Sequence, residues 1–374
     1  MKAVFINNNI TGVLIFRKDV IESFEQAGWE ISIIIPKSEF GSEIFKKIPK
    51  SWNVYTADLD ANSNNPTKDI KYLKNLISIF KKIKPNIVMT YTVKPNIYGA
   101  IACAACRIPC ISMMAGLGYL FSGNGMKQKI GRTLYKFALK NAERIVVLNK
   151  SNYDKLLSMN FTTANKLIWL KSGEGVNLQK YPATDTTYEN VRFLMVARIL
   201  YDKGYREFVE AARIVKQKYP DAIFEILGGT DYTSPTGVPK DVIDHDKKEG
   251  IVSFLGITDD VPYFMSRENT IVTIPSKYLE GLNRSLMEAC SIGCPIITTD
   301  IPGCKETVSD GVNGYLVPAA NSEKLAEAMI RMINLTPDER KSMASASHKL
   351  ALEKFDVHKV INVYQNLVAE ILDY

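Results

Sequence analysis

The chain has 374 residues and 46% hydrophobic content, which predicts two or three domains with cores of their own, and no apolar run approaches the 18 or so residues needed to span a bilayer. The first residues run directly into an apolar strand without the layout of a cleavable signal peptide, and six scattered cysteines favour buried thiols over a metal site, so we expect a cytoplasmic protein. The formal net charge is +7, and residues 1–180 hold 26 Lys and Arg against 12 Asp and Glu, so we expect this half to face something anionic. No recognised nucleic-acid motif occurs, and nucleic acid is not expected as a partner.

Residues 1–180 alternate between short apolar runs and longer stretches of helical periodicity. This alternation predicts a parallel sheet with helices on both faces. The polar stretch 7–12 after the first run ends in Gly12, where the backbone could approach a diphosphate closely. The expected strands lie near residues 3–7, 30–35, 53–55, 87–91, 110–113, 144–148 and 167–170, and the expected helices near residues 17–27, 69–82, 98–107, 125–141 and 150–159.

The densest run of cations lies between residues 126 and 144. They are interleaved at helical spacing with Leu134, Phe137 and Ala138, which predicts a basic amphipathic helix. Such a helix is suited to an anionic membrane surface. The alternative is a helix that packs its apolar stripe on its own sheet and leaves its lysines in water. The cations are Lys127, Lys129, Arg132, Lys136, Lys140 and Arg144.

A polar, turn-rich stretch at residues 177–190 separates this half from a second one. The alternation restarts at residue 191, which predicts a second parallel sheet. The expected strands lie near residues 191–197, 223–227, 251–254, 270–274 and 295–298, and the expected helices near residues 205–218, 284–292, 322–334 and 357–372.

Two cations mark the end of the first strand of this second half. The strand runs into Arg198, and Lys203-Gly204 precede the next helix. At the C-terminal end of a strand in an open α/β sheet, both would point into the ligand-binding crevice. The planar fork of Arg and the point charge of Lys suit a diphosphate. The alternative is a surface cation pair neutralised by Asp202 and Glu207.

The most informative stretch lies between residues 278 and 301. Glu280 and Glu288 are separated by seven residues, with Gly281 closing a loop between them and Glu288 in the helix that follows. If the intervening residues are mostly helical, the two carboxylates lie roughly 12 Å apart, which suits the sugar and the ribose of a folded nucleotide-sugar. The helix N-terminus near Arg284 and Ser285 offers backbone N–H groups to a diphosphate. A solvated acidic loop before an ordinary amphipathic helix is the alternative.

Together these motifs resemble the retaining family 4 glycosyltransferases, which have the α/β architecture called GT-B: two Rossmann-like, doubly wound parallel-sheet domains facing a central cleft. The resemblance covers essentially the whole chain. It implies an acceptor-binding domain at residues 1–180, with the last helix, 357–374, packed back on it, and a nucleotide-sugar-binding domain at residues 190–356. The matching motifs are Arg198-x-x-x-x-Lys203-Gly204, Gly228-Gly229, Glu280-Gly281 with Glu288-Ala289, Ile301-Pro302-Gly303 with Glu306, Gly311-x-x-Gly314 and the run 172–177.

The resemblance is strongest to the bacterial branch that builds capsule, O-antigen and lipid-linked oligosaccharides, including N-acetylgalactosaminyltransferases, through Lys94-Pro95-Asn96 and Gly116-Leu117-Gly118. It implies retaining transfer from a UDP-sugar to a hydroxyl of a polyprenyl-diphosphate-linked sugar at the inner face of the plasma membrane, without metal or cofactor. Arg198 and Lys203 would stabilise the leaving diphosphate, Glu280 would bond the donor sugar and Glu288 the ribose. The expected donor side further includes Gly12, Gly228, Gly229, Thr258, Gly281, Leu282, Asn283, Arg284 and Ser285, and the expected acceptor side Lys94, Asn96, Gly116 and Gly118.

One departure from the family pattern concerns histidine. Many members have a histidine after the fourth strand that contacts the donor sugar, whereas residues 89–96 contain none, so we expect Lys94 or Asn96 in that role. Two other classes stay open. A non-hydrolysing UDP-sugar epimerase shares the fold, but the lack of any histidine before His245 argues against its acid–base chemistry. A non-catalytic nucleotide-sugar-binding subunit would tolerate the loss of Lys203 or Glu280, and both are present.

Overall fold

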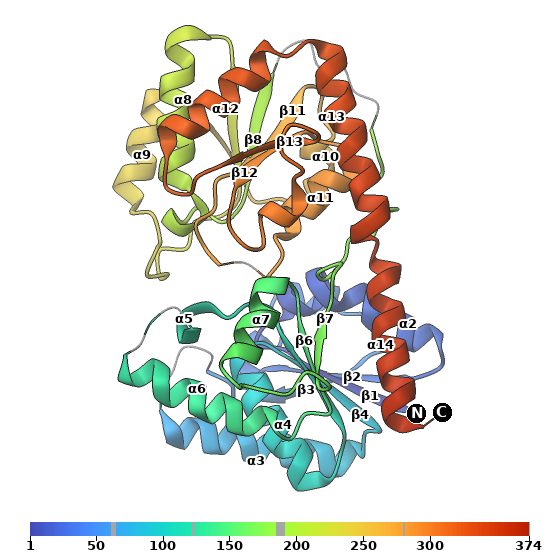
Figure 1. The fold of residues 1–374 in the computed structure, drawn as a ribbon. Coiled ribbons are helices and arrows are strands. Elements are labelled where there is room, and N and C mark those ends of the chain that lie inside the picture. The colour runs from blue at the N-terminus through green and yellow to red at the C-terminus, as the bar shows by residue number, and fades with distance from the viewer. Residues whose placement is uncertain (61–64, 122, 124, 185–190, 280, 374) are drawn as a thin grey trace. The chain divides into compact units, whose positions relative to one another are not determined.

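The computed structural model describes residues 1–60, 65–121, 123, 125–184, 191–279 and 281–373. The chain forms two compact units: unit 1 is Met1–Glu174 with Val357–Tyr374, and unit 2 is Gly175–Asp356. Each unit is a parallel sheet with helices on both faces (Figure 1). This confirms the expected pair of Rossmann-like, doubly wound domains.

The sheet of unit 1 has seven parallel strands in the order β3-β2-β1-β4-β5-β6-β7. Nearly every residue of the central strands is buried, as expected when helices cover both faces of a parallel sheet. The order reverses between β1 and β4, so a crevice opens there at the C-terminal ends of the strands. The strands are β1 (Lys2–Ile6), β2 (Glu30–Pro36), β3 (Asn53–Ala57), β4 (Ile87–Tyr91), β5 (Cys110–Met114), β6 (Arg144–Val147) and β7 (Leu167–Trp169).

The helices of unit 1 cover both faces of this sheet. Helix α14 comes from the C-terminus and packs against α2, burying Val360, Tyr364 and Val368 in the same core as Phe5 and Phe24 (Figure 1). The helices are α1 (Ile10–Gly12), the π-helical turn η1 (Val13–Arg17), α2 (Lys18–Gln26), η2 (Lys37–Glu39), η3 (Ile44–Lys47), α3 (Pro66–Ile83), α4 (Val93–Cys106), α5 (Gly118–Phe121), α6 (Met126–Leu139), α7 (Lys150–Ser158) and α14 (Val357–Leu372).

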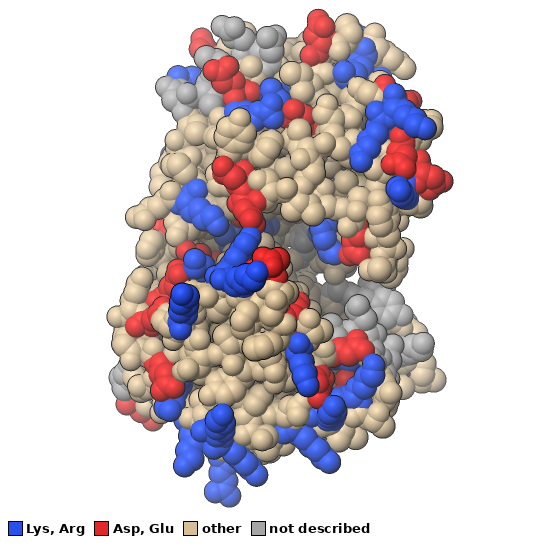
Figure 2. All heavy atoms as spheres, turned by 180° about the vertical axis from the view of Figure 1, so that it is seen from behind, with Lys and Arg blue, Asp and Glu red and all other residues tan. Residues whose placement is uncertain are grey.

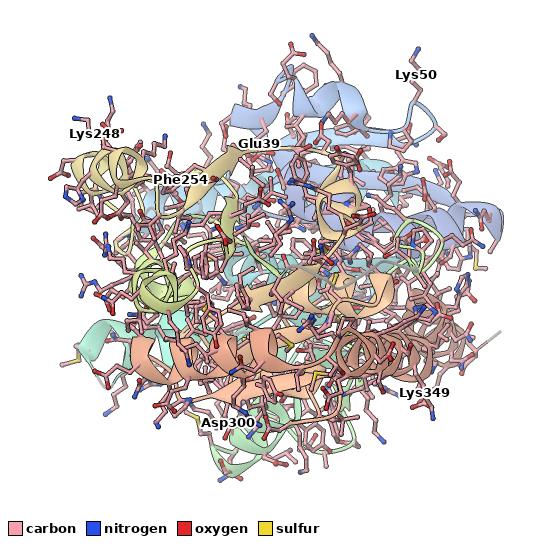
Figure 3. All side chains as sticks on the ribbon, turned by 90° about the horizontal axis from the view of Figure 1, so that it is seen from above. Glu39, Lys50, Lys248, Phe254, Asp300 and Lys349 are labelled. Carbon is pink, nitrogen blue, oxygen red and sulfur yellow. The ribbon has the colours of Figure 1, made fainter. Side chains whose placement is uncertain are left out.

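The sheet of unit 2 has six parallel strands in the order β10-β9-β8-β11-β12-β13, and its order reverses between β8 and β11. Figure 3 shows Phe254 of the edge strand β10 beside α9, where the Lys247 ammonium lies 5.4 Å from its ring centroid. The strands are β8 (Arg192–Val196), β9 (Ile223–Leu227), β10 (Ser253–Gly256), β11 (Thr270–Ile274), β12 (Ile296–Thr299) and β13 (Gly314–Val317). The helices are η4 (Tyr201–Lys203), α8 (Tyr205–Lys218), α9 (Lys240–Glu249), α10 (Val261–Met265), α11 (Arg284–Ile292), η5 (Lys305–Thr307), α12 (Ser322–Asn334), α13 (Pro337–Leu350) and η6 (Ala351–Phe355).

The units divide at Glu174, upstream of the turn-rich stretch 177–190 where we expected the break. The reason is a packing contact that polarity does not reveal. Tyr181 is buried with Leu286 and Met287 in the core of unit 2, and the Ser291 hydroxyl donates to its carbonyl at 2.5 Å. Residues 175–184 therefore belong to unit 2, while residues 185–190 lie outside the described part of the chain.

Candidate functional site

In unit 2, the strand ends nearest the point of reversal carry both halves of the expected donor site. The loop after β8 contains Arg198 and Lys203, and the loop after β11 leads into α11 with Glu288. Because parallel strands present their C-terminal ends at one edge of a sheet, the fold brings together two motifs that lie about 80 residues apart.

Hydrogen bonds and a cation–π contact join the loop after β8 to the loop after β11. The backbone N–H groups of Lys277 and Tyr278 both donate to the Asp202 carbonyl, at 2.8 and 3.1 Å. The Lys203 ammonium lies 4.9 Å from the centroid of the Tyr278 ring, a cation–π contact. Gly204 has φ +86, and a Cβ there would lie 2.1 Å from the Pro275 carbonyl oxygen. The glycine of the Lys203-Gly204 pair is therefore required for this close approach.

Arg198 lies near the start of the loop after β8, and its side chain is 63% exposed. Its Nη1 lies 3.1 Å from Oδ2 of Asp231, which follows β9. The hydroxyl of Thr233 and then the Arg198 guanidinium hold the pKa of Asp231 below its usual value, so the carboxylate stays ionised. A guanidinium with one carboxylate partner and wide exposure retains donors that an anionic ligand can use.

Gly228 and Gly229 follow β9 and make room for the protein's own atoms: backbone at Gly228 and a side chain at Gly229. A Cβ on Gly228 would lie 1.8 Å from the Ala197 carbonyl oxygen, and one on Gly229 would lie 2.7 Å from Ile257. The two glycines thus allow the strand ends to approach each other, in addition to any room they leave for a base. Thr258, beyond β10, uses its hydroxyl to accept from the Asp260 N–H at 3.0 Å.

The segment before α11 differs from the sequence expectation. Glu280 lies outside the described residues, and the helix begins only at Arg284, so the distance of roughly 12 Å between the Glu280 and Glu288 carboxylates stays a prediction. Asn283 caps the helix: its Oδ1 accepts from the Leu286 N–H at 3.1 Å. The cap satisfies one of the free N–H groups that we had assigned to a diphosphate, and Ser285 lies within the capped first turn.

The Arg284 side chain is held by contacts within unit 2, whereas the expected diphosphate contact involved backbone N–H groups near Arg284 and Ser285. Its Nε donates to Glu288 at 2.8 Å and its Nη1 donates to the Gly175 carbonyl at 2.9 Å. Both side chains of the pair are almost completely buried. The buried Tyr181 phenol also faces Glu288; burial, and then this carboxylate, raise the pKa of Tyr181. Arg284 therefore orients Glu288 and balances its charge.

In unit 1, the residues expected on the acceptor side follow β4 and β5, and Gly12, expected on the donor side, follows β1. Gly12 is in the short helix α1 and not in an open loop, which corrects our expectation. A Cβ on Gly12 would lie 2.7 Å from the Asn7 amide and 2.8 Å from Oδ1 of Asn9, so the glycine makes room for two asparagines. Gly116 lies in the turn after β5, and Gly118 begins α5.

Lys94 and Asn96 are engaged inside unit 1, so a sugar contact by Asn96 was a wrong expectation. Asn96 is completely buried, and its amide donates to the Met113 carbonyl and to the Tyr135 hydroxyl, at 2.8 and 2.6 Å. The Lys94 ammonium donates to Asp69 at 2.7 Å, and its side chain is only 14% exposed. Asn96 supports the strand ends from behind, and Lys94 is a neutralised cation.

The structure points to Thr92, which the sequence analysis had passed over. It follows β4 at φ 72 and ψ 169, a backbone region that is nearly exclusive to glycine. Among the described residues, its hydroxyl is one of the buried polar groups without a hydrogen-bond partner. Strain of this kind concentrates at ligand sites, and Thr92 directly follows β4, in the segment where the family pattern led us to expect a histidine. The missing histidine was the available signal.

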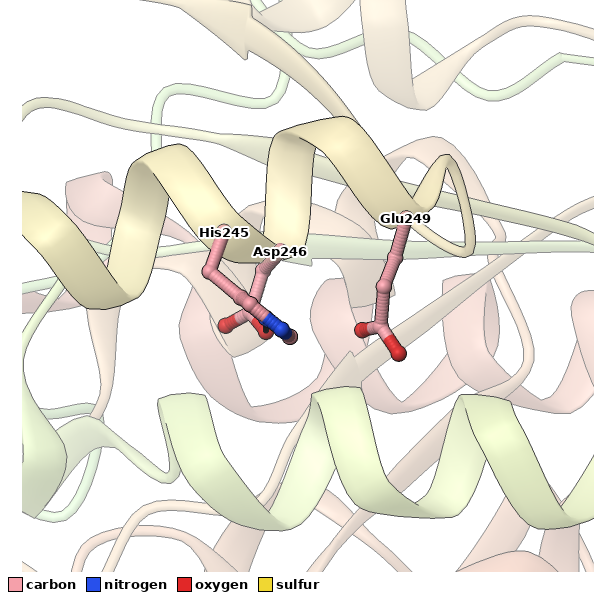
Figure 4. A group of neighbouring side chains, drawn as sticks. All are labelled: His245, Asp246 and Glu249. Atoms are coloured by element: carbon pink, nitrogen blue, oxygen red, sulfur yellow. Dashed lines mark ion pairs between the residues drawn. The ribbon is translucent and has the colours of Figure 1, made fainter.

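One cluster in unit 2 has the composition of a metal site. In Figure 4, His245, Asp246 and Glu249 project from α9. Arg213 of α8 donates to Asp246 at 2.7 Å and to Glu249 at 3.0 Å, and the Tyr205 hydroxyl donates to Asp246 at 2.6 Å. These contacts already balance the carboxylates, so the cluster joins α8 to α9 through ion pairs.

Two parallel-sheet units with ligand-facing loops at their points of strand reversal define the GT-B class. Comparison with known families agrees with this fold: residues 9–149 match the family described as Glycosyl transferase 4-like, and residues 184–350 match Glycosyl transferases group 1. The chain belongs to the glycosyltransferases that combine these two domains, and it is a glycosyltransferase enzyme.

Among similar proteins, one from Campylobacter jejuni is 25% identical over 99% of this chain and 96% of its own length. It is an N,N'-diacetylbacillosaminyl-diphospho-undecaprenol alpha-1,3-N-acetylgalactosaminyltransferase. An Escherichia coli UDP-Gal:alpha-D-GlcNAc-diphosphoundecaprenol alpha-1,3-galactosyltransferase is 26% identical over 71% of this chain and 70% of its own. The crystal structure of Anabaena HepE in complex with UDP has the same fold, with a TM-score of 0.78, 17% identity, and coverage of 99% of this chain and 100% of that one.

Proposed function

We propose that this enzyme transfers a hexose or N-acetylhexosamine, with retention, from a UDP-sugar to a hydroxyl of a lipid-linked saccharide. The observation that carries the proposal is the contact between the loops after β8 and β11, where the strand order of unit 2 reverses. There, Lys203 lies against Tyr278 of the segment that leads to Glu288, and Arg198 precedes Lys203 in the loop after β8. Two cations and a backbone that tolerates close approach are suited to the diphosphate of a nucleotide-sugar.

In the proposed reaction, the bond between the anomeric carbon and the diphosphate oxygen breaks while the acceptor oxygen bonds to the same face of that carbon. Arg198 and Lys203 stabilise the charge that develops on the leaving diphosphate. The acceptor proton passes to an oxygen of that diphosphate, so no side-chain base is needed. Glu280 bonds hydroxyls of the donor sugar, and Glu288, oriented by Arg284, bonds the ribose. Backbone and side chains near Gly228, Gly229, Thr258 and Gly281 to Ser285 complete the donor side in unit 2.

The acceptor side is proposed for unit 1, around the strand ends that carry Thr92, Lys94, Gly116 and Gly118. Both similar enzymes from Campylobacter jejuni and Escherichia coli have names that specify a diphospho-undecaprenol acceptor, which supports the same class here. Unit 1 carries 26 Lys and Arg against 14 Asp and Glu, a formal +12, while unit 2 carries a formal −5. This asymmetry supports work at an anionic membrane surface, the inner face of the plasma membrane in bacterial surface-polysaccharide synthesis.

Lys203→Ala tests the donor assignment directly. Because the variant removes a cation from the leaving diphosphate, we expect kcat/KM for transfer to fall by about 100-fold or more. Lys324→Ala is the matched control, since Lys324 is an exposed lysine of the same unit that is paired with Glu327 on α12. Transfer by the Lys203 variant at the wild-type rate, with normal UDP binding, would overturn the proposal.

Two further measurements define the reaction class. We propose that transfer needs no metal; complete loss of turnover in EDTA, restored by a divalent cation, would contradict this. Incubation with UDP-GlcNAc alone should leave the sugar unchanged, whereas an epimerase would convert it without an acceptor. The donor and acceptor are then identified by following UDP release across a panel of nucleotide-sugars, with and without a polyprenyl-diphosphate sugar.

A further inference from the structure

Helix α6 has two apolar faces, and only one of them is used within the described part of unit 1. Its inner face buries Tyr135, Ala138 and Leu139 in the core, and the Tyr135 hydroxyl accepts from the Asn96 amide at 2.6 Å. With about 100° per residue, these three side chains span one side of the helix. This contact with the core decides which way the other face must point.

The opposite face carries a second apolar stripe that is exposed. Met126, Ile130 and Phe137 are 75%, 62% and 62% exposed, and Leu134 is 38% exposed. At about 100° per residue, these four fall within an arc of about 80°, and Met126 is diametrically opposite Tyr135. Exposed apolar residues are unremarkable singly, but four in one stripe along a helix mark a contact surface.

Lysines flank this stripe. The apolar stripe has Met126 at one edge and Leu134 at the other. Lys129, Lys136 and Lys140 lie beyond the Met126 edge, about 40° to 80° further around the helix. Figure 2 shows how densely lysines and arginines cover the lower end of unit 1 in that view. An apolar strip bordered by cations fits the interface of an anionic bilayer, with the side chains among the acyl ends and the ammonium groups at the phosphates.

The same helix is tied to the acceptor-side segment. Nη1 of Arg132 donates to the carbonyls of Leu120 and Gly123, at 2.8 and 2.6 Å. The Leu120 carbonyl lies within the short helix α5, which begins at Gly118, and the Gly123 carbonyl follows that helix. A surface that holds α6 therefore also holds the segment that leads from β5.

We propose that α6 lies flat on an anionic membrane through the stripe Met126, Ile130, Leu134 and Phe137, and thereby presents the acceptor-side segment to a lipid-linked substrate. The second clause rests on the proposed function; the first does not. Within the described residues, no helix is long and apolar enough to cross a bilayer. A flat contact of this kind is shallow, on the order of 5–10 Å deep.

A second copy of the chain is the competing occupant, and charge disfavours it. In a two-fold dimer, each stripe meets its own equivalent, so the flanking lysines of both copies would converge without acidic partners. In α6 itself, no Asp or Glu is present to relieve that repulsion. An anionic surface instead neutralises each lysine.

Vesicle sedimentation tests the surface independently of catalysis. With about 30% phosphatidylglycerol in phosphatidylcholine, we expect Ile130→Ser with Phe137→Ser to weaken binding at least tenfold, and Lys129→Gln with Lys136→Gln by about 25-fold, roughly fivefold per lysine. Phe40→Ser is the matched control, because Phe40 is 61% exposed in the same unit. Circular dichroism melts confirm folding. Wild-type binding by the stripe variant, or equal loss in the control, would overturn the proposal, as would a wild-type dimer in light scattering that the stripe variant abolishes.

Activity on two acceptors then separates the membrane proposal from the proposed function. The stripe variant should lose turnover with a long-chain acceptor in vesicles and keep it with a short-chain, water-soluble acceptor. Equal turnover in both assays would refute the docking role while leaving transferase activity established. If wild-type protein binds vesicles but transfers sugar to neither acceptor, the proposed function fails and the membrane surface stands.

Discussion

Gly204 provides the sharpest test of how the donor loops are assembled. We consider Gly204→Ala, which places a methyl group 2.1 Å from the Pro275 carbonyl oxygen at a backbone φ of +86. The conformation alone costs an alanine about 1–2 kcal/mol. Because the clash is with backbone, the two loops must separate, and overpacking of this kind adds about 1–3 kcal/mol. We therefore expect a total destabilisation of about 2–5 kcal/mol.

The matched control is Gly250→Ala. Gly250 has φ +67 at the end of α9, but a Cβ there would meet nothing within 4 Å. It should lose only the conformational part, about 1–2 kcal/mol. Urea unfolding of both variants measures the difference, which isolates the Pro275 contact.

Function should separate the two variants further. Moving the loops apart displaces Lys203 from Tyr278, and a displacement near 1 Å at a reacting centre costs about 100-fold in rate. We expect Gly204→Ala to reduce transfer by about 10- to 100-fold, while Gly250→Ala keeps the wild-type rate. Equal stability losses in the two variants, or full activity in Gly204→Ala, would refute the argument that this glycine holds the loops together.

Three other outcomes follow from local features of the two units. Thr92→Gly and Thr92→Ala both remove the buried hydroxyl, but only glycine relieves the backbone strain after β4. Thr92→Gly should therefore have a free energy of unfolding about 1 kcal/mol above that of Thr92→Ala; equal values in urea unfolding would contradict the role of strain. Of the six thiols, only Cys106 is partly exposed, and it alone should react quickly with a thiol reagent in the native protein. The other five are buried, and burial raises the pKa of Cys294, for example, to about 12. All six should react in urea, and two or more fast thiols in the native state would contradict the prediction. Hydrogen bonds from the Thr336 N–H and hydroxyl hold the pKa of Glu339 below its usual value. This capping box therefore stabilises α13 at pH values above the ordinary glutamate pKa and loses that contribution as the pH falls through the lowered pKa. Glu339→Gln should remove this part of the pH dependence in thermal melts.

Several features of the site could be predicted because they depend on short-range chemistry. The apolar runs that became strands of 3 to 7 residues, and the Lys203-Gly204 pair before α8, are local sequence patterns. The contact between the loops after β8 and β11 follows from strand order, because an α/β alternation allows few topologies and brings the C-terminal ends of the strands to one edge of the sheet. Lys203 was therefore expected in the loop that contacts the segment leading to Glu288, while its role toward a diphosphate stays a prediction.

Other side chains were misjudged because their partners are distant in the sequence. Arg284 was expected at a helix N-terminus whose backbone faces a diphosphate, and the sequence did not reveal that its side chain bonds Gly175, which lies 109 residues earlier. Asn96 appeared to face a sugar, yet its amide is used by Met113 and Tyr135 inside the core. A buried amide or guanidinium takes the hydrogen-bond partner that the fold provides, because leaving it unsatisfied is costly.

By itself, the amino-acid sequence determined the alternation of strands and helices, the glycines at the close approaches, and the basic character of α6. Only the tertiary structure decided which of the two apolar stripes of α6 is buried, that Tyr181 belongs to unit 2, and that Thr92 is strained. The physical reason is that propensity and periodicity act over a few residues, whereas burial is settled by contacts between elements that are far apart in the chain.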